Sequence, residues 1–236
     1  MKNLRTLPVF LASVFLSLSH DGRCGNFDVS PIRVRLDEST PAAALTLRNA
    51  GESPVVIHAE VMKWKIPEKY SPTREILVNP PIFTIPPQGS QVIRVGLSKP
   101  TFASDELAYR LYLQEVLPPP KAGSSGLRTA LRLGVPIFIP PKIIRPDLQW
   151  RATRSKEGDV QIEALNRGNI HVQLIELELS IPGNPTMSRK VRKYLLPGEK
   201  SRWNVGGSAR WNPGNLKLKA RTDGGEVHAT LEVRAS

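Results

Sequence analysis

Residues 77–95 read LVNPPIFTIPPQGSQVIRV, and this stretch decides the fold class. Short alternating apolar runs lie on either side of the turn signal Pro86-Pro87-Gln88-Gly89, which is typical of half-buried strands. The pattern extends outward from Phe27 to the C-terminal end, and no segment keeps apolar residues at helical spacing behind a capping residue. The 22 prolines also disfavour long helices. The chain is therefore predicted to be all-β.

Two series of short strands are predicted, separated by the proline-rich segment 140–146. The first series covers 28–36, 43–48, 55–64, 75–78, 91–97, 107–116 and 127–139. The second covers 148–153, 160–165, 171–181, 189–196, 200–204, 216–221 and 227–233. Because prolines at this density cannot occupy a central strand, the segment marks a domain junction. We expect two immunoglobulin-like β-sandwich domains in tandem, over residues 26–143 and 147–236.

The first 25 residues are predicted to be a secretory signal peptide. A basic start, 1–5, precedes the apolar run 7–19, which is too short to span a bilayer as a helix. The cleavage site stays open between residues 19 and 25. The single cysteine, Cys24, lies in this region, and the preceding Asp21-Gly22-Arg23 does not suit a lipidation site. An exported chain cut after Cys24 has no disulfide, so packing alone must hold its fold.

The net charge of +12 raises the question of a nucleic-acid partner. Export argues against that partner, and the cations are spread evenly over the two predicted domains. The basic cluster 189–193 is interpreted as a solvated strand face. His20 lies in the predicted signal peptide, and His58, His171 and His228 lie in predicted strands without a paired Cys or carboxylate at metal-ligand or triad spacing. We therefore expect no metal, no cofactor, no nucleic acid and no enzymatic activity.

Several motifs in order carry a family resemblance: 44–49, 55–64, 77–95, 106–118, 165–172 and 195–199. Together they resemble the PapD-like periplasmic chaperones of the chaperone/usher pathway. The resemblance implies an ATP-independent periplasmic chaperone with two sandwich domains set at an angle around a cleft. Such a chaperone binds and caps pilus subunits by donor-strand complementation and delivers them to an outer-membrane usher. An exposed donor strand also implies that the free chaperone can self-associate.

The resemblance places the donor strand at 127–139. Its alternate positions are apolar with one gap, and they are expected to fill the subunit's groove: Leu127, Thr129, Leu131, Leu133 and Val135. The periodicity alone favours a different interpretation, an ordinary core strand, because every sandwich strand alternates. The family resemblance reverses that preference.

The resemblance also implies an Arg and a Lys that anchor the subunit's terminal carboxylate. The Arg matches Arg33, with Arg35 as an alternative on the same strand face. The Lys position is occupied by Pro136, which has neither charge nor backbone donor. Arg110, inside an apolar strand, is the candidate substitute, and a solvent-facing role is its alternative. The Pro136 departure suggests the archaic branch associated with spore-coat-like pili.

Two other functions stay open on the sequence. A secreted sandwich that binds glycans or cell-surface ligands has the same composition. A structural pilus component is disfavoured, because two complete strand series follow the signal almost at once.

Overall fold

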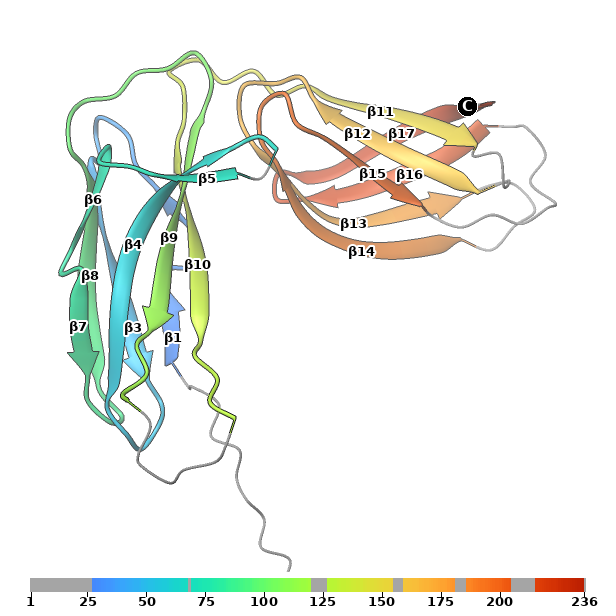
Figure 1. Ribbon diagram of the computed structural model, residues 1–236. Coiled ribbons are helices and arrows are strands. Elements are labelled where there is room, and N and C mark those ends of the chain that lie inside the picture. The colour runs from blue at the N-terminus through green and yellow to red at the C-terminus, as the bar shows by residue number, and fades with distance from the viewer. Residues whose placement is uncertain are drawn as a thin grey trace, which may run out of the picture.

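A computed structural model describes residues 27–67, 69–119, 127–154, 159–180, 186–204 and 215–235. The predicted signal peptide and Cys24 lie outside these ranges. All regular elements within them are β-strands, and they form two domains that meet at an angle, so that the chain has two arms (Figure 1). The described part of the chain contains no helix long and apolar enough to cross a membrane. The prediction of two β-sandwiches is confirmed.

Two facing sheets build the first domain. One sheet has the order β1-β3-β8-β6, with β1 Phe27–Ser30, β3 Ala42–Asn49, β8 Ser90–Leu97 and β6 Ile76–Asn79. The other has the order β2-β10-β9-β4-β5, with β2 Val34–Arg35, β10 Arg132–Ile139, β9 Leu107–Glu115, β4 Val55–Lys65, β5 Lys69–Pro72, and β7 Ile82–Ile85 paired to β4. Alternate apolar residues of both sheets, such as Leu45, Ile57 and Leu111, are fully buried between them.

The second domain is one sheet folded around its own core. Its strand order is β14-β13-β16-β17-β11-β12-β15, with β11 Leu148–Arg154, β12 Val160–Asn166, β13 Val172–Ser180, β14 Met187–Leu195, β15 Lys200–Asn204, β16 Asn215–Thr222 and β17 Gly225–Ala235. The parallel pairing of β11 with β17 joins its two layers. Ile162, Leu174 and Leu218 are among the buried residues that fill the space between them.

Two strand predictions for the first domain are wrong, and two short strands were not predicted. The predicted strand 28–36 is two strands, β1 and β2, which pair in different sheets. Pro31 lies between them, and a proline interrupts a continuous ladder, so the chain changes sheets there. The short strands β5 and β7 were not predicted as separate elements. The predicted strand 127–139 begins only at Arg132. Its partner β9 ends at Glu115, which lies opposite residue 131, and the chain then runs on to Pro118 outside the sheet.

Each domain has a buried asparagine that closes an Asn-x-Gly turn. In the first domain the Asn49 Nδ2 donates to the carbonyls of Ser53 and Pro86, at 2.8 and 3.2 Å. In the second domain the Asn166 Nδ2 donates to Ile170 and Leu195, at 2.7 and 2.9 Å. Both side chains are completely buried. The same device therefore ties a turn to a neighbouring strand in both domains.

Asn166→Ala is expected to destabilise the protein by about 3 kcal/mol, because the buried carbonyls of Ile170 and Leu195 lose their donor. Urea unfolding followed by circular dichroism measures the change. The exposed Thr46→Ala on β3 is the control and should change stability by less than about 0.5 kcal/mol. Equal effects of the two substitutions would contradict a structural role for the Asn166 amide.

Candidate functional site at the angle between the domains

An aromatic cluster joins the two domains. The first domain contributes Trp64 on β4 and Phe138 on β10, and the second contributes Tyr194 on β14 and Leu196. The Trp64 and Tyr194 rings meet edge to face with centroids 5.8 Å apart, and the Phe138 and Tyr194 centroids are 5.6 Å apart. Since Trp64, Phe138 and Leu196 are nearly fully buried, the contact behaves as a small core between the domains.

A chain of charged groups lies beside this cluster. His171 Nδ1 is 2.6 Å from Glu106 Oε2, and the His171 backbone N–H donates to the same oxygen at 2.7 Å. On its other side His171 Nε2 is 3.5 Å from Asp223 Oδ2. Arg33 Nη1 donates to that Asp223 oxygen at 2.6 Å. The His171 ring stacks on Phe138 with centroids 3.7 Å apart. Glu106 and Arg33 of the first domain are thus tied to His171 and Asp223 of the second.

The pKa values of this chain follow from its partners. Burial acts to lower the pKa of His171, but hydrogen bonds with Asp223 and Glu106 outweigh it, and the pKa is raised. Burial acts to raise the pKa of Asp223, but hydrogen bonds from His171, Gln173 and Arg33 hold it well below its usual range. Both carboxylates therefore favour the protonated form of the His171 imidazole.

Asn169 fixes the linker against this junction. It is 4% exposed, and its Nδ2 donates to the carbonyls of Ser104 and Ile143 at 3.0 and 2.8 Å. The Arg145 backbone N–H donates to the Asn169 Oδ1 at 2.7 Å. The neighbouring Gly168 leaves no room for a side chain, because a Cβ there would lie 2.6 Å from the Asp147 nitrogen. Few positions in the linker can therefore change without moving one arm against the other.

The predicted anchor residue Arg33 lies in this junction, at the segment between β1 and β2. Its side chain is 40% exposed and already forms an ion pair with Asp223. A cavity of about 590 Å³ opens beside it, and Phe138, His171 and Asp223 contribute to the lining. The alternative residue, Arg35, is exposed on β2 and lies 3.8 Å from Asp37. Arg33 is the one of the two that meets the second domain.

Arg110 lies directly across from Pro136 in the register of β9 and β10. Its guanidinium stacks over the Trp64 ring, with the Cζ 4.2 Å from the ring centroid. The Arg110 Nε is buried and has no hydrogen-bond partner among the described residues. A Cβ at Gly134 would lie 3.0 Å from the Arg110 Cδ, so the glycine leaves space for the arginine stem. Arg110 on β9 thus places a cation beside Pro136, the position where the family resemblance implies a lysine.

Tyr194 connects the two predicted anchor residues. Burial raises its pKa, and the positive charges of Arg33 and Arg110 both oppose that rise. Both guanidinium groups therefore act on the same phenol. Arg110 stacks on Trp64, whose ring packs against Tyr194, and Arg33 pairs with Asp223 beside His171, whose ring also lies against Tyr194.

The predicted donor strand has an open edge. β10 pairs with β9 along its whole length, but on its other side it pairs with β2 only at Ile137 and Phe138. The Phe138 carbonyl accepts from Leu36 beyond β2, and the Leu131 carbonyl accepts from Glu115 on the β9 side. Because backbone groups alternate in direction along a strand, Arg132, Gly134 and Pro136 turn theirs toward the open edge. Pro136 offers a carbonyl there but no N–H.

The predicted groove-filling side chains differ in burial. Leu127 is 97% exposed, and Thr129 is exposed. Leu131 and Leu133 are partly buried at the rim of the first core. Val135 is 2% exposed and packs inside that core. Four of the five residues therefore leave apolar or small surface available along the edge, while Val135 fills its own domain.

Sequence reasoning missed His171, Glu106 and Asp223 as a group. His171 was noted only as a histidine without a nearby partner, and its partners are 65 and 52 positions away in the sequence. The turn at Asp223-Gly224-Gly225 signalled a hairpin and gave no indication of a buried contact. The described residues contain no group of three or more His, Cys, Asp or Glu arranged to hold a metal ion.

The interdomain contact is expected to weaken as the pH rises. The folded-state pKa of His171 lies above its unfolded value of 6.5, so its stabilisation is complete below that value and is lost through the raised pKa. The melting temperature should fall by a few degrees between about pH 6 and about pH 9. His171→Phe keeps the ring stack on Phe138 and should flatten this dependence. The exposed His58→Phe on β4 is the control, and an unchanged pH profile in His171→Phe would refute the assignment.

Solved structures of similar shape are pilus chaperones. CsuC, in complex with the tip adhesion subunit CsuE of the archaic Csu pili of Acinetobacter baumannii, is 21% identical, with 90% of this chain and 100% of that chain covered and a TM-score of 0.64. The YadV chaperone is 20% identical, with 87% and 100% covered and a TM-score of 0.65. SafB, in complex with the SafA pilin of Salmonella enterica, is 18% identical, with 89% and 98% covered and a TM-score of 0.65.

A search of curated proteins found no match to the sequence. A family profile does match, described as the pili and flagellar-assembly chaperone, PapD N-terminal domain, and it covers residues 26–145. That range holds every strand of the first domain, including the open edge of β10. The resemblance inferred from the motifs is thereby confirmed, and the chain belongs to the PapD-like family of pilus-assembly chaperones.

Proposed function

We propose that this chain acts in the periplasm, without ATP or catalysis, and holds a pilus subunit in the angle between its two domains until an outer-membrane usher accepts it. The open edge of β10 carries the proposal. A subunit that lacks one strand has unpaired backbone groups and an exposed apolar groove, and an added strand satisfies both. Family membership makes pilus subunits the expected partners.

The backbone groups at the open edge of β10 determine which of its residues can pair with a subunit strand. Arg132 and Gly134 each turn an N–H and a carbonyl outward, so they can form a two-way ladder with a subunit strand. Pro136 can only accept, and beyond it β2 already occupies the edge at Ile137 and Phe138. The subunit strand is therefore expected to pair from Pro136 back toward residue 127. Leu127, Thr129, Leu131 and Leu133 then enter the groove, with Val135 as the boundary inside the chaperone's core.

Arg33 and Arg110 are proposed to hold the subunit's terminal carboxylate. Arg33 uses Nη1 for Asp223, and the rest of its guanidinium makes no bond to other described residues. Arg110 keeps a buried Nε without a partner, and an anionic oxygen would supply one. Arg33 pairs with Asp223 and Arg110 stacks on Trp64, both at the junction that Tyr194 joins, so we place the subunit's carboxylate at this junction between the two cations.

Leu127→Glu is expected to weaken complex formation with a pilus subunit that the wild-type protein binds. The residue is 97% exposed, so the fold should be unaffected while a charge enters the apolar groove. Co-expression in the periplasm followed by affinity isolation measures the yield of complex, which should fall on the order of tenfold or more. Leu77→Glu is the matched control, since Leu77 is 57% exposed on β6, in the other sheet. Equal yields from the two variants would exclude residue 127 from the donor segment.

Arg110→Gln is expected to weaken subunit binding on the order of tenfold or more, because the carboxylate loses a charged donor. The competition of the variant with the wild-type protein for a limited amount of subunit gives the ratio of affinities. A subunit shortened at its C-terminus serves as the control, since the anchor should then make no difference. If Arg110→Gln competes as well as the wild-type protein for the full-length subunit, Arg110 is not part of the anchor.

A further inference from the structure

The edge strand of the second domain, β14, has an irregularity centred on Arg192. The pairing of β14 with β13 runs through Lys193 opposite Leu174 and Lys190 opposite Glu176, so β14 has one more residue than its partner between these points. Arg192 lies in this bulge with a φ of 43°, in the left-handed region. Glycine or asparagine adopts that conformation at lower cost than arginine. Bulges with such residues recur at sheet edges where a side chain is redirected for function.

Most charges on this face of the sheet have partners. Glu176 on β13 is 2.8 Å from Arg221 on β16, and Lys219 is 2.9 Å from Glu226 on β17. Lys190 and Arg192, both exposed on β14, have no carboxylate within salt-bridge distance in the described part of the chain. We name these two residues the β14 basic pair. Lys190 lies opposite Glu176 in the register and its charge helps to lower the pKa of that carboxyl, so Arg192 is the cation of the pair with no carboxylate partner on this sheet among the described residues.

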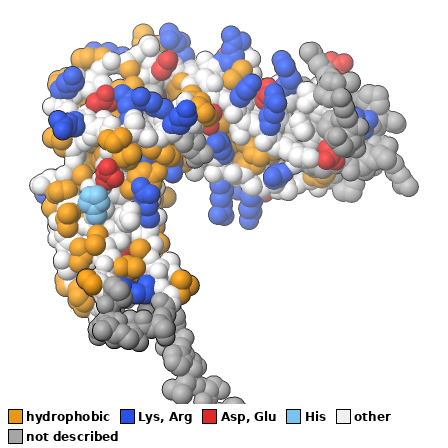
Figure 2. Space-filling view, viewed as in Figure 1, with side chains coloured by type: hydrophobic (Ala, Val, Ile, Leu, Met, Phe, Trp, Pro, Cys, Tyr) orange, Lys and Arg blue, Asp and Glu red, His pale blue; other side chains and the backbone are white. Residues whose placement is uncertain are grey.

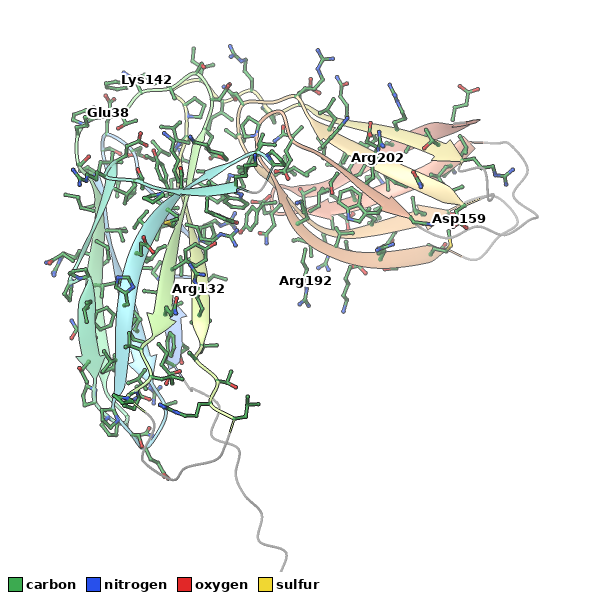
Figure 3. The ribbon with its side chains drawn as sticks, in the orientation of Figure 1. Glu38, Arg132, Lys142, Asp159, Arg192 and Arg202 are labelled. Carbon is green, nitrogen blue, oxygen red and sulfur yellow. The ribbon has the colours of Figure 1, made fainter. Side chains whose placement is uncertain are left out.

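Arg192 of the β14 basic pair lies on the inner side of the angle between the arms (Figure 3). Tyr194, two residues beyond Arg192 on the same strand, packs against Trp64 and Phe138 of the first domain. Arg192 lies farther along β14 from that contact, and it projects into the space beneath the second domain. Arg132 on β10 lies across this space from it (Figure 3). Blue side chains project from this underside (Figure 2). A subunit paired with the open edge of β10 would therefore lie in the angle, next to β14.

We propose that Lys190 and Arg192 form a second contact with the bound subunit and receive acidic side chains from its surface. This inference rests on the proposed function, because it requires a subunit in the angle. The contact is separate from the donor strand and from the carboxylate anchor, since it lies on the other domain. Exposed cations at the rim of an interface act chiefly on the rate of encounter and on its dependence on salt. Partner recognition is thereby shared between both arms.

The experiment follows capture of a denatured pilus subunit as it is diluted into an excess of chaperone at about 50 mM and about 300 mM salt. Arg192→Glu should slow capture on the order of tenfold at low salt and much less at high salt. Lys190→Gln should slow capture less, in the same direction. Arg48→Glu is the matched control, since Arg48 is exposed on β3 in the other sheet of the first domain.

Arg192→Gly separates recognition from folding. Glycine relieves the positive φ, so the melting temperature should be maintained or raised, while capture slows because the charge is gone. If Arg192→Glu captures the subunit at the wild-type rate and with the wild-type salt dependence, the inference is wrong, and the basic pair serves only to protect an exposed strand edge. If the wild-type protein captures no subunit, the proposed function fails first.

Discussion

The imidazole of His171, held between Glu106 and Asp223, is the contact on which the arrangement of the molecule depends. It joins a carboxylate of the first domain to one of the second, and it stacks on Phe138 near the end of β10. A charged group in this setting is stable only if both partners stay in place. The angle between the arms, and therefore everything that faces into it, follows from this contact and the aromatic cluster beside it.

Arg33 shows how the same contact shapes the site. The family resemblance assigned the carboxylate to Arg33, with Arg35, two residues on, as the alternative. In the folded chain Asp223 engages one nitrogen of Arg33, and Arg35 is directed toward Asp37. Folding thus distinguishes two arginines that the sequence could not separate. The same Nη1 that donates to Asp223 also lies 3.4 Å from His171 Nε2, so the junction fixes the direction of the Arg33 guanidinium.

Pro136 and Arg110 form one local arrangement. Pro136 lacks a backbone N–H at a position that faces the open edge, where no described strand of this chain pairs with it. Gly134, two residues earlier on β10, leaves space for the Arg110 stem. The sequence permitted the inference that a cation must replace the missing lysine. It could not show that Arg110 lies directly opposite Pro136, because that depends on the register of β9 against β10.

The sequence by itself determined the all-β class, the two-domain organisation and the family, because these depend on local alternation, turn residues and motifs in order. It misjudged 28–36 and 127–131, where strand formation depends on which neighbour is present to complete the ladder. Only the tertiary structure decided the open edge of β10, the ion pair of Arg33 and the placement of the β14 basic pair. The reason is physical: these features arise between residues far apart in the chain, and no local pattern records which long-range contacts bring them together.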